Sequence, residues 1–336
     1  MDYGKINIKY DDLELKTPSS KKLTTHDKIF LVLISGILGI AAFGFDLISE
    51  NFVYVVKRID WVMNSYYDSV VMQNLVQIVY SLVALLIPFG IGAIVIKLVK
   101  RDTDLLPFRK PKSGGIFVSS LGISFIALVV SNFVTSMIII IFQFIGFEFD
   151  GGYYEAPTNI PEFLLQVVSI AIVPAFAEEF AVRGVLLQSL RKYGDVTAIF
   201  ISALLFALMH GNFNQAPFAF IMGIVIAYFV IVTDSLWTGI AIHCMNNFYA
   251  LIVSVLSEYA IDFIYLVVVM SINVIGCLLG ILAIIWLVEN KTWDDFKIKN
   301  EFGKLEPTLL GIVSPTMIFA IVWLFIECCE NVSFVG

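Results

Sequence analysis

Long, uninterrupted apolar runs constrain this chain more than any other feature of its sequence. A run of about 18 or more apolar residues is typical of a transmembrane helix, because about 20 residues are needed to cross the hydrocarbon core of a bilayer. Hydrophobic residues make up 59% of the 336 residues and charged residues 15%, whereas soluble domains are about half apolar and a quarter charged. The sequence therefore predicts an all-α, polytopic bundle of membrane helices.

We expect about nine spans in a single transmembrane domain, 29–336, which follows a polar tail, 1–28. They are Ile29–Ile48, Val70–Ile96, Ile116–Ile145, Phe163–Val182, Ala198–Met209, Ala216–Val232, Leu236–Leu256, Phe263–Val288 and Leu309–Ile326. The fifth is short for a full crossing. The tail is too long and too acidic for the start of a cleaved signal peptide, so the first span is expected to be retained.

The charged loops predict an orientation, because short loops rich in Lys and Arg stay in the cytoplasm. Three loops qualify: Lys97, Lys100, Arg101, Arg109, Lys110 and Lys112 in the first, Arg191 and Lys192 in the second, and Lys291, Lys297, Lys299 and Lys304 in the third. The loop with Glu148, Asp150 and Glu155 is acidic and is expected outside. The N-terminus is then cytoplasmic and the C-terminus outside.

Charge and cysteine content argue against a nucleic-acid-binding protein and against a protein built on disulfides or cysteine metal sites. The net charge of -7 and the absence of a basic stripe argue against a nucleic-acid partner. Cys244 and Cys277 fall within apolar runs, while Cys328 and Cys329 are adjacent, so neither a disulfide framework nor a cysteine metal motif is indicated.

Two adjacent carboxylates, Glu178 and Glu179, interrupt the fourth apolar run. Charged side chains at membrane depth are costly and mark functional sites by default. Glu179 and Arg183 are spaced i,i+4 and are expected to pair, whereas Glu178 lies about 100° around the helix and is not offered that partner. Glu178 is therefore the better candidate for a catalytic base. Pro174, four residues earlier, removes a backbone donor and is expected to kink the helix.

Two of the three histidines lie at the ends or inside of apolar helices, and His26 lies in the polar tail. His210 closes the fifth run, and His243 shares a helix face with Asn247 at i,i+4. Glu178 lies 16 residues before Gly194 and His210 lies 16 after it. A hairpin that turns near Gly194 would bring both to the same depth, roughly 24 Å from the turn. The polar stretch from Gln188 to Asp195 predicts that this hairpin projects beyond the bilayer.

The expected cluster supplies a base, a charged orienting pair and several donors. Its members are Glu178, Glu179, Arg183, His210, His243 and Asn247. Such a set can activate water and stabilise an oxyanion. Glu178, His210 and His243 would equally make a zinc site with three protein ligands and an open position. The residues alone leave both alternatives open.

The ordered motifs Glu-Glu-x-x-x-Arg, Phe-x-x-x-His and His-x-x-x-Asn resemble those of the CPBP family. This family comprises type II CAAX prenyl proteases and bacteriocin-processing or abortive-infection proteins. The second motif begins at Phe206, and the resemblance covers roughly residues 160–255. It implies an intramembrane endopeptidase in which Glu178 and His210 activate water. Glu179 and Arg183 would then support the site, and His243 and Asn247 would stabilise the oxyanion.

The resemblance implies a peptide or protein substrate held at the bilayer, either a prenylated CAAX-like protein or a bacteriocin or peptide precursor. A metal-free mechanism is favoured, with no cofactor required and zinc as the alternative. The Ile- and Phe-rich composition suggests a multi-pass protein of a bacterial plasma membrane. Two rival functions remain: a non-catalytic membrane immunity or scaffold protein, and a proton- or cation-coupled transporter, for which the expected repeated halves are missing.

Overall fold

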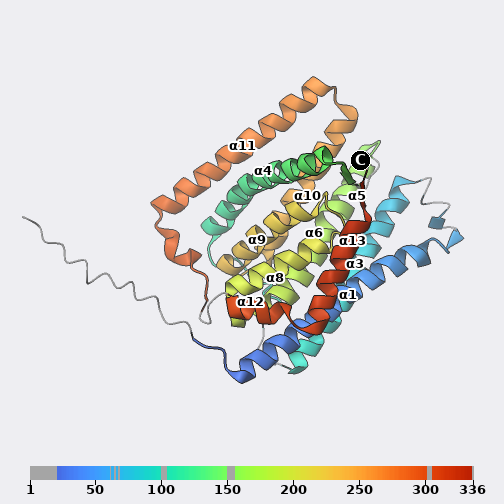
Figure 1. Ribbon diagram of the computed structural model, residues 1–336. Coiled ribbons are helices and arrows are strands. Elements are labelled where there is room, and N and C mark those ends of the chain that lie inside the picture. Colours follow the sequence, from blue (N-terminus) through green and yellow to red (C-terminus); the bar gives the residue numbers. More distant parts are fainter. Residues whose placement is uncertain are drawn as a thin grey trace, which may run out of the picture.

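Long α-helices form most of the protein (Figure 1). The computed structural model describes residues 21–60, 62–63, 66, 69–99, 104–149, 156–300 and 305–334. The longer helices are α1 (Thr25–Val56), α3 (Val70–Val99), α4 (Gly114–Phe144), α8 (Asp195–Leu208), α9 (Ala216–Thr233), α10 (Leu236–Tyr259), α11 (Asp262–Glu289), α12 (Leu305–Ile312) and α13 (Pro315–Glu330). The predicted tail up to Ser20 and five loop residues used for the orientation lie outside the described residues: Lys100, Arg101, Asp150, Glu155 and Lys304.

The all-α membrane bundle is confirmed, but the count of nine spans is not. Seven helical segments in the described part of the chain are long and apolar enough to cross a membrane, and an eighth is possible if α12 and α13 count as one. The predicted fifth span is α8, which has 14 residues and reaches only about 21 Å at 1.5 Å per residue. The predicted ninth span is broken by a 77° bend between α12 and α13.

The bend between α12 and α13 has a local cause. Pro315 begins α13, and the hydroxyl of Ser314 accepts a hydrogen bond from the Met317 backbone N–H as the N-cap. A capping serine followed by proline is a helix-start signal, because proline at the first helical position has no backbone donor to lose. The apolar run passes through this signal, so hydrophobicity alone predicted one continuous helix.

The fourth span is one helical run, Ile160–Tyr193, with irregular turns inside it. It passes through α5 (Ile160–Gln166), the π-helix η2 (Val167–Ile172), α6 (Val173–Glu179), the π-helix η3 (Phe180–Leu186), α7 (Leu187–Leu190) and the 3-10 turn η4 (Arg191–Tyr193). Pro174 lies in the first turn of α6, directly after η2. π-helical turns are rare and occur often at functional sites, and here they flank the two glutamates.

The helices are arranged with the glutamate-bearing run near the centre (Figure 1). α1, α3 and α13 lie on one side, and α4 and α11 lie on the other. α11 packs mainly on α4, where a Cβ added at Gly122 would lie 3.2 Å from the Cα of Gly280. Such close approach of small residues is how helices associate when no water drives them together. α6, α8, α9 and α10 lie between these two sides.

The two ends of the bundle differ. At one end the strands β1 (Phe147–Phe149) and β2 (Val332–Phe334) pair antiparallel, with Phe147 opposite Phe334. At the other end lie the predicted basic loops, where Lys192 reaches Asp27 at 3.7 Å. The hairpin turn at this end does not project freely. Asp195 is buried, and its carboxylate accepts a hydrogen bond from the Lys299 backbone N–H at 2.7 Å. The polar side chains of this stretch are bonded within the protein, and its projection beyond the bilayer stays a prediction.

Candidate active site

The predicted ion pair between Glu179 and Arg183 is confirmed. Nη1 of Arg183 donates to Oε1 of Glu179 at 2.7 Å, and both side chains are 0% exposed. Arg183 lies within the π-helical turns of η3, which begin directly after Glu179, and the two side chains still meet. A buried charge needs a partner of opposite sign and further hydrogen bonds to offset its desolvation. The pair is therefore the fixed part of the cluster.

Arg183 also contacts two helices outside the helical run that carries the glutamates. Its Nη2 donates to the backbone carbonyl of Gly223 on α9 at 3.3 Å. Its guanidinium carbon lies 4.3 Å from the centroid of the Phe206 ring on α8. A guanidinium over an aromatic face is attracted by the negative face of the ring, and more strongly when both are desolvated.

His243 on α10 lies against both glutamates. Its Nδ1 is 2.9 Å from Oε1 of Glu179, and its Nε2 is 3.5 Å from Oε2 of Glu178. A carboxylate paired with an arginine accepts, so Nδ1 is the donor in the first contact. This leaves Nε2 facing the second carboxylate. Glu178 itself is the more open of the two, with 23% of its side chain exposed.

His210 follows the end of α8 and is held by its own helix. Its Nδ1 lies 2.7 Å from the backbone carbonyl of Phe206. A carbonyl can only accept, so Nδ1 carries the hydrogen and Nε2 is left as an acceptor. The Phe206 ring makes edge contacts with both imidazoles, with centroids 4.8 Å from that of His210 and 5.7 Å from that of His243. Phe206 therefore contacts three of the predicted site residues.

The structure brings the six predicted residues into one region, but it does not join all of them. Among the described residues, Glu178 makes no hydrogen bond or ion pair with His210, and Oε2 of Glu178 has no hydrogen-bond partner. Asn247 donates its Nδ2 hydrogen to the backbone carbonyl of Ile170 at 3.1 Å. The catalytic roles of these residues remain predictions.

The zinc alternative can be tested on the positions of the ligand atoms. In the described part of the chain, one group of three or more His, Cys, Asp or Glu brings its ligand atoms within 4.8 Å of one another: Asp46, Glu50 and Glu327. Glu178, His210 and His243 do not meet this spacing. The arrangement therefore does not fit a three-ligand zinc site as it stands.

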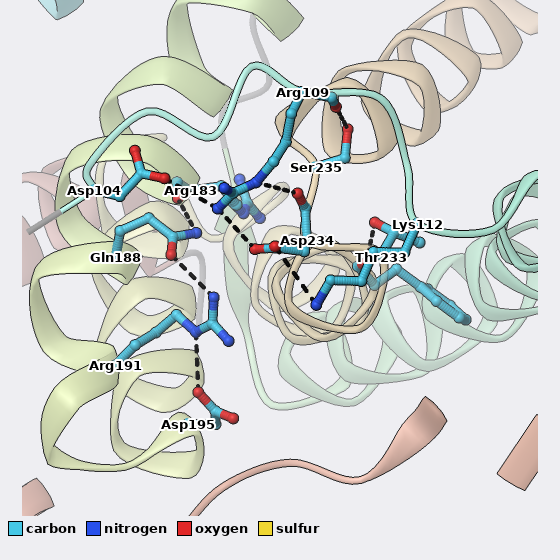
Figure 2. A network of polar contacts seen from close by, with 11 residues as sticks. Asp104, Arg109, Lys112, Arg183, Gln188, Arg191, Asp195, Thr233, Asp234 and Ser235 are labelled. Carbon is cyan, nitrogen blue, oxygen red and sulfur yellow. Dashed lines mark hydrogen bonds and ion pairs between the residues drawn. The ribbon is translucent and has the colours of Figure 1, made fainter. Parts of the chain in front are cut away.

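A chain of polar contacts leads from Arg183 to the hairpin turn (Figure 2). Nε2 of Gln188 donates to the Arg183 carbonyl at 3.2 Å, and Arg191 donates to Oε1 of Gln188 at 3.1 Å. Nε of Arg191 then reaches Oδ1 of Asp195 at 3.0 Å. These contacts satisfy backbone and charged groups that would otherwise be buried unpaired. They fix the C-terminal end of the helical run that carries the two glutamates.

The loop before α4 fixes the turn between α9 and α10 in a similar way (Figure 2). Asp234 adopts a left-handed backbone with φ of 52°, a conformation that Asp tolerates better than most residues. Arg109 donates to its carboxylate and to its carbonyl, both at 3.1 Å. Ser235 donates its hydroxyl hydrogen to the carbonyl of Arg109 at 2.5 Å. Because α10 starts at this turn, these contacts help set the position of His243.

One contributor to the site was missed from the sequence. Gly239 lies one turn before His243, and a Cβ added there would lie 2.6 Å from Oε2 of Glu179 and 2.7 Å from Cγ2 of Val230. Only glycine allows α10 to approach the glutamate so closely. The spacing Gly239, His243 and Asn247, at i, i+4 and i+8, is the signal that could have identified this face.

Comparisons with known proteins agree with the motifs. Residues 160–249 match the model of a family described as type II CAAX prenyl endopeptidase Rce1-like. No curated protein and no solved structure matches the chain. The matched segment contains all six predicted site residues. Over residues 160–249, this integral, multi-pass membrane protein is therefore similar to the type II CAAX prenyl endopeptidases, a match that supports the resemblance to the CPBP family of intramembrane proteases.

Proposed function

We propose that this protein is an intramembrane endopeptidase in which Glu178 activates water to hydrolyse a peptide bond of a membrane-held substrate. The observation that carries the proposal is the division between the two glutamates. Glu179 is fully buried and its Oε1 is bound by Arg183 and His243, whereas 23% of the Glu178 side chain is exposed. Of the two carboxylates, Glu178 is therefore the one that solvent can reach.

Proton transfer follows from this geometry. The Glu178 carboxylate takes a proton from water, and the resulting hydroxide attacks the scissile carbonyl carbon to give a tetrahedral oxyanion. His210 offers Nε2 as an acceptor for the same water, because its Nδ1 hydrogen is bound to the Phe206 carbonyl. The proton on Glu178 then passes to the leaving amine as the C–N bond breaks. Water is consumed, and one carboxylic acid and one amine are formed.

The oxyanion would be stabilised from α10. Nε2 of His243 lies 3.5 Å from Oε2 of Glu178, so the proton taken from water can be shared with the imidazole. The ring then carries positive charge beside the developing oxyanion. An amide nitrogen has two hydrogens, and the Asn247 amide therefore keeps a second hydrogen after donating one to Ile170. Donors already in place contribute much of the stabilisation of such transition states.

The proposed substrate is a prenylated CAAX-like peptide. The family description names this class of endopeptidase for residues 160–249, and the glutamates, His243 and Asn247 lie on helices long and apolar enough to cross a membrane. A lipidated peptide partitions into the bilayer, which brings its C-terminal region near such a site. Nothing in the comparisons supports a bacteriocin precursor. No metal is required by these steps.

The test is cleavage of a fluorescent farnesylated CAAX peptide by the purified full-length protein in lipid nanodiscs. Wild-type protein should cleave it, and the same peptide without the farnesyl group should be cleaved more slowly. Glu178→Gln and His210→Ala should abolish cleavage while the apparent melting temperature stays within about 2 °C of wild type, because general-base catalysis contributes about 10²–10⁴-fold.

Glu162→Gln is the matched control. Glu162 lies on the same helical run, but it is half-buried and binds Thr158 at the helix start, away from the site. The cleavage activity of the Glu162→Gln variant should remain within about twofold of wild type, because substitutions away from a site have small effects. Cleavage retained by Glu178→Gln would refute the role of Glu178. No cleavage of either peptide by wild-type protein would reject the proposed substrate class.

A further inference from the structure

The backbone carbonyl of Ile170 lacks its usual α-helical hydrogen-bond donor, because of the residue four positions later. In an α-helix, the N–H of residue 174 would donate to the carbonyl of residue 170. Residue 174 is proline, which has no N–H. The helix has π-type turns at Val167–Ile172 and resumes as α6 at Val173. Pro174 therefore removes the ordinary α-helical donor of a backbone acceptor inside the membrane, where an unsatisfied carbonyl costs several kcal/mol.

A side chain from another helix takes this place. Nδ2 of Asn247 on α10 donates to the Ile170 carbonyl at 3.1 Å. The two residues are 77 positions apart in the chain, so the bond joins separate elements. Asn247 lies one turn after His243, on the same face of α10. Its hydrogen bond therefore acts on the part of the helix that carries the imidazole.

The same face of α10 contacts the glutamate run at three successive turns. Gly239 allows close approach to Glu179. His243 binds Glu179 through Nδ1 and faces Glu178 through Nε2. Asn247 binds Ile170. A helix held at several points along one face cannot easily rotate about its axis, so the third contact limits the orientations open to His243.

We propose that Pro174 and Asn247 form a positioning device: the proline leaves the Ile170 carbonyl available, and the Asn247 amide binds it to hold His243 against Glu178 and Glu179. Neither residue needs to contact the substrate for this role. The device rests on the proposed function for its effect on catalysis, but the bond itself can be tested without activity. It gives Asn247 a role besides that of an oxyanion donor.

A double-mutant cycle separates the two roles, because Pro174→Ala restores an N–H that can donate to Ile170. Four full-length proteins in nanodiscs are compared: wild type, Pro174→Ala, Asn247→Ala and the double variant. The readouts are the apparent melting temperature and the kcat and KM for the farnesylated peptide. Asn247→Ala should lower kcat by about tenfold or more with KM within about twofold, because the Ile170 carbonyl loses this donor and His243 loses its support. In the Pro174→Ala background, the same change should lower kcat by a smaller factor, because only the oxyanion donor is then lost.

Two further variants serve as controls. Asn247→Asp keeps the side-chain shape but replaces the donor by an acceptor, so it should behave like Asn247→Ala. Asn246→Ala changes the adjacent buried amide, which does not bind Ile170 in the structure. Its effect should be the same in both backgrounds.

Additive effects of Pro174→Ala and Asn247→Ala on both kcat and melting temperature would overturn the proposal and leave Asn247 as an oxyanion donor alone. If wild-type protein cleaves no peptide, the proposed function fails, and the melting-temperature cycle still decides on the bond. Non-additive melting temperatures then support it, and additive ones refute it.

Discussion

Gly239→Ala tests whether the close approach of α10 to Glu179 holds the site together. The added Cβ would lie 2.6 Å from Oε2 of Glu179 and 2.7 Å from Cγ2 of Val230, which is well inside van der Waals contact. Glu179 cannot move aside freely, because its other oxygen binds Arg183 at 2.7 Å and His243 at 2.9 Å. Either α10 shifts or these two bonds are lost.

The magnitude follows from known costs. An extra methyl group in a packed interior costs about 1–3 kcal/mol, and each kcal/mol lowers the melting temperature by about 2–4 °C in domains of 150–250 residues. We therefore expect a fall of about 2–6 °C in the apparent melting temperature, taking the lower slope for this larger chain. Cleavage should fall by at least tenfold, because a displacement of about 1 Å at a catalytic group can cost 10²-fold.

The assay is thermal unfolding in nanodiscs, followed by intrinsic fluorescence, together with peptide cleavage. Gly90→Ala on α3 is the matched control, since a Cβ at Gly90 would meet nothing within 4 Å. There the alanine should stabilise the protein by about 0.5–1 kcal/mol, because glycine loses more backbone entropy on folding. If Gly239→Ala behaves like Gly90→Ala in both assays, the close approach does not hold the site.

Three further outcomes are expected. Arg183→Lys should lower the melting temperature by several degrees, because an ammonium cannot reproduce both the bond to Gly223 and the stacking on Phe206; an unchanged melting curve would contradict this. Dialysis against a chelator should leave cleavage within about twofold, since the candidate ligand atoms do not converge; loss of activity that zinc restores would make Glu178 and the histidines metal ligands. In a chain whose native cysteines are replaced, a cysteine at Lys110 should resist an impermeant thiol reagent in intact cells while one at Glu148 reacts, as the distribution of basic loops predicts; the opposite labelling would reverse the orientation.

The parts of the site that were predictable from sequence are those set by one helix. Glu179 and Arg183 pair because four residues span about one turn, whatever surrounds them. The membrane bundle was predictable for a related reason, since the bilayer requires long apolar helices. The first inference needs only the geometry of a single helix, and the second needs only the thickness of the bilayer.

The contacts between helices could not be obtained in this way. The sequence places His243 and Asn247 on one face of a helix, but not which atoms that face meets. His243 binds the glutamate that was assigned to Arg183, and Asn247 binds a backbone carbonyl. A backbone carbonyl that accepts a hydrogen bond cannot be identified from the residue types in the sequence. The rotation of α10 is also set by distant contacts, such as those of Arg109 with the turn at Asp234.

The two glutamates should respond differently to the same substitution. Glu179 accepts from Arg183 and His243, and Arg183 in turn contacts Gly223 on α9 and Phe206 on α8. Glu179→Gln would leave the Arg183 charge buried without a counterion, which costs about 3–5 kcal/mol, so stability and cleavage should be lost together. Glu178→Gln removes a carboxylate without a hydrogen bond at Oε2, so cleavage should be lost while the melting temperature is kept. Equal loss of melting temperature in both variants would mean that the two carboxylates share one structural role.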